Sequence, residues 1–410
     1  MYAPCYGVGQ AVNHPPKFLT RAIVFLALLA TAALAAALTQ RSNDPAIAGR
    51  WSLAYAAFLC GLAAIAACGW LACLGSVQRG LWSARKPLAL LGASLGLSLM
   101  ACEIAFRILD PLGLGYHDEI GRYIQLRQDD DVLAYVQPRD IETELDGVQV
   151  RFNNKGLRGP DIVPQKGARR RLLVLGDSVA FGWGVAEESI FVTRLAESLS
   201  QATGTTWESI NAGVCSYNTE QEFLYLENAG LALQPDLVVL VYVDNDIVTY
   251  AEKWKDAEAA KPPLRRRIKR TLLKSHLLQA ATHLARRGGN GIELEGVERA
   301  VDASDPGWVR NMRALEQLVK LCAQHDLPLA AYHFRWRSDA WSDALLAAAR
   351  EAAAPIEITD TAPWFDHIDL RQLVNSVTDS HPNARAHALT AQRMQHDLEE
   401  RKLFEVVTKR

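Results

Sequence analysis

The residue best placed for chemistry is a serine that directly follows an apolar run. The sequence reads Arg171-Leu-Leu-Val-Leu175 and continues into Gly176-Asp177-Ser178. In an open parallel sheet the ligand crevice lies at the carboxyl ends of the strands, so a strand here would carry Ser178 to that crevice. A serine hydroxyl becomes a nucleophile when a base lies beside it. The alternative is that Asp177 and Ser178 only cap a helix N-terminus, which both side chains do well.

A candidate base stands near the C-terminus, in the run Thr378-Asp379-Ser380-His381-Pro382-Asn383. The imidazole of His381 titrates near neutral pH and could take the serine proton, while the Asp379 carboxylate could orient the ring and stabilise the imidazolium. Asp366 or Asp369 could orient the ring instead of Asp379, or a backbone carbonyl could serve in a dyad.

Two other histidines compete with His381 for the role of base. His387 falls in the first turn of a predicted amphipathic helix, where a histidine more often packs or caps. His333 lies within an apolar run, and we expect it in the core. His381 is therefore the preferred base.

Donors at the same predicted edge could stabilise negative charge. The second and third predicted strands end at Asn211-Ala212-Gly213 and at Val243-Asp244-Asn245-Asp246. A glycine N–H is open to a ligand, and an Asn amide supplies two neutral donors. Together with the Ser178 N–H, the Gly213 N–H and the Asn245 amide could form an oxyanion hole. Each could instead be an ordinary turn residue.

The elements that must position these residues form an α/β pattern. Five apolar runs predict strands over 171–175, 207–211, 236–243, 329–334 and 356–359. Amphipathic stretches predict helices that include 195–199 and cover 220–231, 309–324, 340–353 and 384–402. Such alternation is typical of a parallel sheet with helices on its faces. We expect residues 111–165 to be an irregular connecting segment and residues 250–305 to be an insertion.

The ordered set Ser178, Gly213, Asn245 and Asp379/His381 resembles the SGNH, or GDSL-type, hydrolase family over about residues 150–400. Flanking runs add to the resemblance, namely 154–158, 181–188 and 213–222. Two positions depart from the family's pattern: Val243 stands where a glycine is usual, and Thr378 stands three residues before the histidine, where an aspartate is common.

The resemblance implies a flavodoxin-like three-layer sandwich and ester hydrolysis or acyl transfer, with no metal or other cofactor. It also implies the site roles. Ser178 would attack the acyl carbon, His381 would act as base and then acid, and Asp379 would orient it. The N–H groups of Ser178 and Gly213 and the Asn245 amide would hold the oxyanion.

The N-terminal part has a membrane-like composition. Three uncharged runs are candidates to cross a bilayer as helices: Ala22–Thr39, Trp51–Gln78, and Pro87–Cys102, which reaches about 20 residues when it is continued to Arg107. We expect a bundle of three transmembrane helices within residues 1–110, with residues 166–410 forming the hydrolase domain. A buried Ala-rich bundle is the alternative. Glu103 and Arg107 are spaced for an i, i+4 ion pair near the end of the third span.

The distribution of cations predicts the orientation in the membrane. Lys17 and Arg21 precede the first run, and Arg79, Arg85 and Lys86 lie between the second and third. The loop between the first two runs carries only two cations, at positions 41 and 50. By the positive-inside rule the large C-terminal part lies outside the cytoplasm.

Charge and cysteine usage exclude several classes of protein. Lys plus Arg number 44 and Asp plus Glu 46, which gives a formal charge of -2. The chain therefore lacks the global basic excess expected of a nucleic-acid-binding protein. The seven cysteines show no spacing typical of metal ligands. Only Cys215 and Cys322 fall in the hydrolase part, and the sequence does not decide whether they form a disulfide. A basic stretch at 261–287 predicts an amphipathic helix that either packs on the domain or meets anionic lipid or polysaccharide.

Taken together, the sequence and the resemblance predict a membrane-anchored, extracytoplasmic serine esterase acting on an acyl ester of carbohydrate or lipid. The alternatives are an O-acyltransferase to cell-surface polysaccharide and a catalytically silent polysaccharide-binding module. The acyl group, the alcohol and the oligomeric state are left open.

Overall fold

The computed structural model describes residues 15–39, 53–247, 275–280 and 305–403, and its chain divides into two compact units. The first unit is Met1–Cys102 and the second is Glu103–Arg410. The division therefore falls inside a helix, α4 (Arg85–Leu109), a little before residue 110.

The described residues of the first unit are mainly helical, because their Ala- and Leu-rich runs favour helix and Pro87 falls in the first turn of its helix, where proline is tolerated. Its elements before α4 are α1 (Lys17–Leu38), α2 (Leu53–Leu71) and α3 (Gly75–Ser83). Gly69 allows α1 and α2 to approach closely, since a Cβ there would lie 3.1 Å from the Ala27 Cα. Trp70 Nε1 donates to Thr31 Oγ1 at 3.0 Å, so a polar contact adds to this apolar packing.

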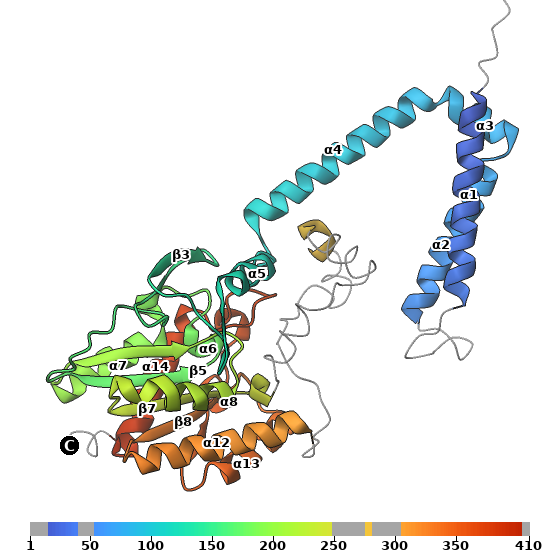
Figure 1. Cartoon of the computed structure of the whole chain (residues 1–410). Coiled ribbons are helices and arrows are strands. Elements are labelled where there is room, and N and C mark those ends of the chain that lie inside the picture. The colour runs from blue at the N-terminus through green and yellow to red at the C-terminus, as the bar shows by residue number, and fades with distance from the viewer. Residues whose placement is uncertain (1–14, 40–52, 248–274, 281–304, 404–410) are drawn as a thin grey trace, which may run out of the picture. The chain divides into compact units, whose positions relative to one another are not determined.

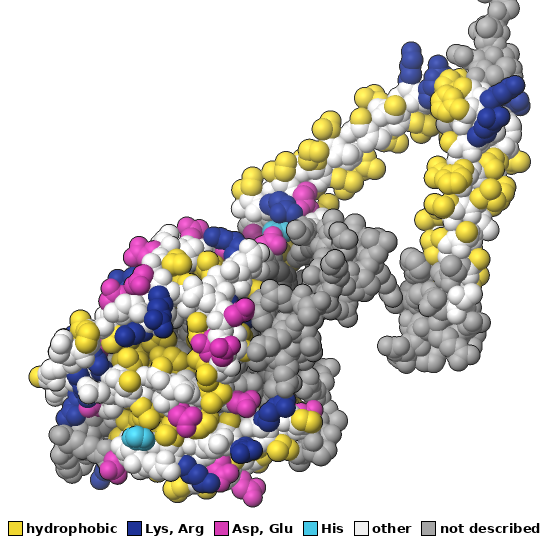
Figure 2. Space-filling model, viewed as in Figure 1, with side chains coloured by type: hydrophobic (Ala, Val, Ile, Leu, Met, Phe, Trp, Pro, Cys, Tyr) yellow, Lys and Arg dark blue, Asp and Glu magenta, His cyan; other side chains and the backbone are white. Residues whose placement is uncertain are grey.

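Of the described helices, α4 alone is long and apolar enough by itself to cross a membrane. A second span would require Leu59–Leu71 and Gly75–Ser83 to act together, although they are bent by 89° at the break between them. Thr20–Ala35 is apolar but shorter. The predicted three-helix transmembrane bundle is therefore not confirmed. Figure 2 shows hydrophobic side chains along α4, none of which is buried.

The second unit is built on a five-stranded sheet in which every strand is parallel to its neighbours. The strands are β5 (Arg170–Gly176), β6 (Trp207–Gly213), β7 (Leu237–Val243), β8 (Leu329–Phe334) and β9 (Ile358–Asp360). They lie in the order β6-β5-β7-β8-β9. Counted within the sheet this is 2-1-3-4-5, the flavodoxin-like order, whose switch point lies between β5 and β7. The predicted parallel sheet is confirmed.

Helices cover both faces of this sheet and make three layers (Figure 1). The helices are α7 (Phe191–Thr203) and α14 (Ala384–Glu400) on one face, and α8 (Thr219–Tyr225), α12 (Pro306–Gln324) and α13 (Ala340–Ala352) on the other. Side chains of β5 alternate between the two faces. Leu172 packs with Leu195 and Met394 in one core cluster, whereas Leu173 packs with Leu318 in the other. A strand buried on both faces has no polar side, which explains the continuous apolar runs.

The segment expected to be irregular, 111–165, is instead largely ordered. It forms α5 (Tyr116–Leu126), a hairpin of β1 (Gln128–Asp130) with β2 (Ala134–Val136), and a hairpin of β3 (Ile141–Leu145) with β4 (Val148–Phe152). Its aromatic side chains supply the reason. The ring of Tyr123 lies 5.5 Å from that of Phe181, just after Ser178, and the Phe152 ring lies 6.2 Å from it.

Most of the predicted insertion, including most of the basic stretch 261–287, lies outside the described residues. Residues 276–280 are helical, and the N–H groups of His276 and Leu277 donate to the Glu103 carboxylate at 3.1 and 3.0 Å. The predicted pair of Glu103 with Arg107 is confirmed at 2.8 Å. Cys215 and Cys322 are both free thiols.

Candidate active site

Ser178 lies at the carboxyl end of β5, at the switch point of the sheet. The strand ends at Gly176, whose φ of +155° favours glycine, and a Cβ there would lie 2.7 Å from the Ala180 Cβ. The chain then turns into a short helix, α6 (Ser178–Phe181). Asp177 caps it, because its Oδ1 accepts the Val179 N–H at 2.9 Å. The capping role weighed for Asp177 thus coexists with exposure of the Ser178 hydroxyl to a cavity.

Three side chains form a hydrogen-bonded chain across 203 positions of sequence. His381 Nε2 lies 2.8 Å from Ser178 Oγ, and His381 Nδ1 lies 2.5 Å from Asp379 Oδ1. All three residues are buried, with 9% or less of each exposed. With the ring proton on Nδ1, facing the carboxylate, Nε2 is the acceptor that faces the serine hydroxyl.

The loop before α14 holds Asp379 in this position. Asp379 Oδ1 accepts the His381 N–H at 3.0 Å, and Oδ2 accepts Asn375 Nδ2 at 3.0 Å. Thr378, which stands where the family commonly has aspartate, points its hydroxyl elsewhere, to the Leu112 carbonyl at 2.7 Å. The two-residue spacing therefore suffices to bring the carboxylate onto the imidazole.

The competing residues lie apart from this chain. Asp366 is exposed, and Asp369 pairs with Arg371 at 2.7 Å. His387 is buried against Phe191, with the rings 5.6 Å apart and nearly parallel, and its Nδ1 accepts the Phe191 N–H. Burial lowers the pKa of His387 to about 3, as expected of a packing histidine. His333 is fully buried in β8.

The three predicted oxyanion donors differ in whether the structure gives their N–H groups another partner. Asn245 lines the cavity with Ser178, and its side-chain amide carries two N–H donors. Ser178 N–H is at the first residue of α6 and so has no partner within that helix. The Gly213 N–H, predicted as a further donor, donates to Asn211 Oδ1 at 2.9 Å. Gly213 instead makes room for α6, since a Cβ there would lie 2.2 Å from the Phe181 nitrogen.

The cavity above Ser178 has a volume of about 160 Å³. Besides the predicted residues, it is lined by side chains that the sequence reasoning missed, namely Asp244, Phe334, Arg335, Trp336, Arg337, Asp339 and Pro382. Four of these, from Phe334 to Arg337, come at or just after the end of β8. The rule that sites lie at strand ends could have found them, because β8 ends at the same edge as β5 and β7.

The ordered connecting segment also contributes to the surroundings of the imidazole. The Tyr116 ring lies 5.6 Å from the His381 ring, and the Trp183 ring lies 6.3 Å from it. Asp146, in the turn between β3 and β4, lines a second cavity together with Asp379. Burial, followed by the charge of Asp379, raises the pKa of Asp146 to about 6.

Three comparisons with known proteins were informative to different degrees. The model of the GDSL-like lipase/acylhydrolase family matches residues 174–389. No curated protein matches the chain. Among solved structures, a two-domain esterase active on acetylated mannans has a TM-score of 0.37 and 15% identity, covering 57% of this chain and 50% of that one. A lipase/acylhydrolase from Enterococcus faecalis has a TM-score of 0.37 and 14% identity, covering 57% of this chain and 96% of that one. The chain thus matches about half the length of the two-domain esterase.

Proposed function

Because the chain belongs to the GDSL-like lipase/acylhydrolase family, we propose that it hydrolyses acyl esters through an acyl-serine intermediate on Ser178. The observation that carries this proposal is the hydrogen-bonded chain from Ser178 Oγ through His381 to Asp379. A buried serine in contact with an oriented imidazole is the arrangement that activates a hydroxyl as a nucleophile.

The reaction follows from the positions of the acceptors and donors. Ser178 Oγ attacks the acyl carbon while its proton passes to His381 Nε2, and Asp379 stabilises the imidazolium. The Asn245 amide and the Ser178 N–H donate to the developing oxyanion. His381 then protonates the departing alcohol, and a water, deprotonated by the same nitrogen, releases the acid and restores the serine.

The lining of the cavity above Ser178 supports a short acyl group. Apolar side chains of Val179, Val243 and Phe334 line part of it, and these suit a small alkyl group such as the methyl of an acetyl ester.

The test is activity-based labelling combined with hydrolysis of a short aryl ester. The protein should react covalently with a fluorophosphonate and release acid from 4-nitrophenyl acetate. The Ser178→Ala variant should lose both, with kcat lower by about 10³-fold or more. Undiminished turnover in this variant would remove Ser178 from the mechanism. Product analysis with a glycan acceptor would separate hydrolysis from transfer of the acyl group.

We further propose that the first unit anchors the protein in a membrane, with the second unit on the extracytoplasmic side. Support comes from α4, a helix of 25 residues with a mean hydropathy of 1.8 over its apolar window and no buried residue. Basic residues Arg79, Arg85 and Lys86 precede or begin it, and the positive-inside rule assigns that end to the cytoplasm.

A further inference from the structure

A carboxylate stands in the cavity beside the proposed oxyanion donor and has no part in the mechanism above. Asp244 directly precedes Asn245 and lines the cavity, with 26% of its side chain exposed. Among the described residues, hydrogen bonds reach only its Oδ1, from His333 Nε2 at 2.7 Å and from Ser342 Oγ at 2.8 Å. The carboxylate is thus held on one oxygen, while the other remains for a group in the cavity.

The two residues that hold Asp244 are themselves fixed by burial. His333 is fully buried in β8, and its ring lies 5.3 Å from that of Tyr242 on the neighbouring strand β7. Ser342 is fully buried in the first turn of α13. Three elements of the second unit therefore meet at this carboxylate, and it has little freedom to turn away.

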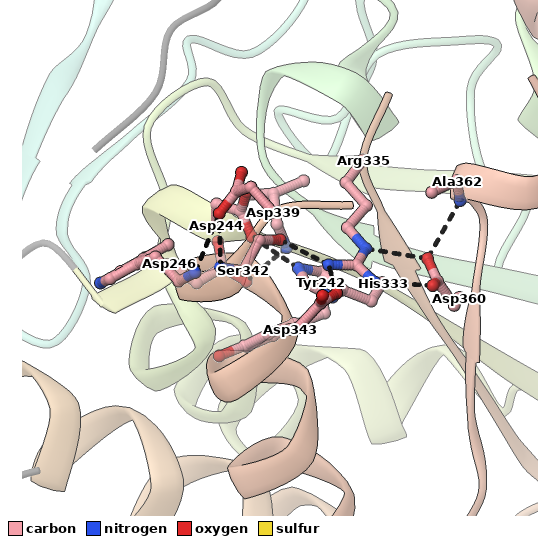
Figure 3. Close-up of polar contacts among 12 residues, drawn as sticks. Tyr242, Asp244, Asp246, His333, Arg335, Asp339, Ser342, Asp343, Asp360 and Ala362 are labelled. Carbon is pink, nitrogen blue, oxygen red and sulfur yellow. Dashed lines mark hydrogen bonds and ion pairs between the residues drawn. The ribbon is translucent and has the colours of Figure 1, made fainter. Parts of the chain in front are cut away.

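A second set of ionic contacts extends this support. Arg335 donates to Ser342 Oγ at 3.0 Å and binds the Asp360 carboxylate through two nitrogens, at 2.9 and 2.6 Å. It also pairs with Asp343 at 2.7 Å. Figure 3 shows this continuous path from Asp244 through Ser342 and Arg335 to Asp360. Since the charge of Arg335 is satisfied by carboxylates, it supports the cavity wall without needing the substrate.

The same cavity offers an aromatic surface and an exposed cation. Trp336 is half-buried, its ring lies 4.9 Å from that of Phe365, and its Nε1 donates to the Ser380 carbonyl next to His381. The ring is therefore fixed relative to the catalytic histidine. Arg337 follows it and is exposed at the cavity.

From this arrangement, and resting on the proposed ester hydrolysis, we infer that the alcohol portion of the substrate is a carbohydrate, with Asp244 accepting a hydrogen bond from a sugar hydroxyl. An ionised carboxylate only accepts hydrogen bonds, so it selects an alcohol that carries further hydroxyl donors. The Trp336 ring supplies apolar surface for the C–H face of the sugar, and Arg337 donates to its oxygens. A polar group fixed in advance discriminates strongly against an analogue that lacks its partner.

Two other alcohols fit the cavity less well. A quaternary ammonium alcohol would be attracted by Asp244 and the Trp336 ring, but Arg337 would repel it, and it has no N–H or O–H for the carboxylate. A long-chain alkyl alcohol carries no hydroxyl besides the esterified one, so it would leave the carboxylate without a donor.

The experiment compares two acetyl esters of similar shape that differ in hydroxyl groups. The substrates are methyl 6-O-acetyl-glucopyranoside and cyclohexylmethyl acetate, with acetylcholine as the ammonium ester. The intact wild-type protein should prefer the sugar ester over the cyclohexyl ester by at least about 10-fold in kcat/KM. In Asp244→Ala this preference should fall by about 10-fold or more, chiefly through KM. Asp244→Asn, which keeps the size but not the charge, should lose a smaller part and decides the matter if the Ala variant does not fold.

The matched control is Glu316→Gln, an exposed position on α12 that lines neither cavity, and its preference should equal that of the wild type. Equal losses on both esters in the Asp244 variants would mean that Asp244 acts through its neighbour Asn245, and would overturn the carbohydrate inference. A wild type that favours acetylcholine or cyclohexylmethyl acetate would overturn it as well. Both results leave the proposed hydrolysis standing, whereas a wild type that neither labels with fluorophosphonate nor cleaves 4-nitrophenyl acetate removes both proposals.

Discussion

At the scale of single residues, the surroundings of two histidines differ in a way that supports the proposed catalytic role for one and a packing role for the other. His381 contacts a hydroxyl on one ring nitrogen and a carboxylate on the other. His387 stacks on Phe191, and burial depresses its pKa to about 3, so it stays neutral at any pH at which the protein would work.

Replacing these histidines should therefore have opposite consequences. His381→Ala should lower kcat on 4-nitrophenyl acetate by about 10³-fold or more, because the base is lost. His387→Ala should keep most of the turnover but lower the free energy of unfolding by about 1–3 kcal/mol, because it opens a cavity under Phe191. Steady-state kinetics and denaturant unfolding measure both effects, and a folded His387→Ala protein without activity would contradict the assignment.

The Asp146 carboxyl gives a prediction about stability and pH. Its folded pKa is raised from the usual 3.8 to about 6, chiefly by burial and then by the nearby Asp379. The folded state therefore binds this proton more tightly than the unfolded state, and the resulting stability is full below about pH 4 and lost as the pH rises through about 6. Asp146→Asn has no such proton to lose. Its stability relative to the wild type should increase between pH 4 and pH 7 in denaturant unfolding curves.

The control for this pH effect is Asp129→Asn, an exposed acid-to-amide change on β1. The same pH course in both variants would indicate a general effect of net charge and would exclude a specific role of the Asp146 proton.

At the scale of elements, the turn from β5 into α6 sets the position of Ser178, the proposed nucleophile. Gly176 adopts a φ that residues with a side chain rarely adopt. A methyl group added to its Cα would lie only 2.7 Å from the Ala180 Cβ. Asp177 and Ser178 follow Gly176 directly, so a displacement of the backbone at Gly176 would be passed on to Ser178. A change at Gly176 should therefore move the serine hydroxyl away from His381 Nε2.

Gly176→Ala tests this dependence. We expect a loss of about 1–3 kcal/mol in stability from the strained backbone and the clash, and a fall in kcat of at least about 10²-fold from displacement of Ser178. Gly204→Ala is the matched control, because Gly204 also has positive φ (+65°) but a Cβ there meets nothing within 4 Å. It should lose about 1 kcal/mol and keep its activity. Normal kcat in Gly176→Ala would show that the turn does not aim the serine.

At the scale of the whole molecule, two units of different character share one chain. The described helices of the first unit expose apolar side chains such as Leu28, Leu90 and Leu97 at half or more of their area, whereas the second unit buries its apolar residues in cores on both faces of a sheet. Exposed apolar surface of this extent is typical of a membrane or partner interface. The family match, residues 174–389, falls wholly within the second unit.

The proposed topology predicts which cysteine probes react from outside a cell. The full chain should stay with the membrane fraction in high salt and leave it only in detergent. A cysteine introduced by Glu316→Cys should react with a membrane-impermeant maleimide added outside, whereas one introduced by Arg79→Cys should react only after the membrane is permeabilised. The reverse labelling would invert the topology, and extraction by salt alone would contradict the anchor.

The five strands of the main sheet illustrate what local sequence pattern carries. Strands of a parallel sheet that are buried on both sides appear as unbroken apolar runs, so all five strands of the main sheet were predicted from the sequence within a few residues. Because the carboxyl ends of such strands share one edge, the residues that follow them could be assigned to one site from the sequence alone.

Contacts between segments that are distant in the sequence could not be predicted from local sequence pattern. Whether the Gly213 N–H is available depends on the side chain of Asn211, and the partner of Asp244 is His333, 89 residues later. The order of segment 111–165 likewise comes from aromatic packing against Phe181 and Trp183. The sequence by itself determined the α/β class and named Ser178, Asp379 and His381, since strand periodicity and local motifs are short-range properties. Only the tertiary structure showed which partners the candidate oxyanion donors have and which side chains line the cavity. Both depend on which side chains meet once the chain is packed.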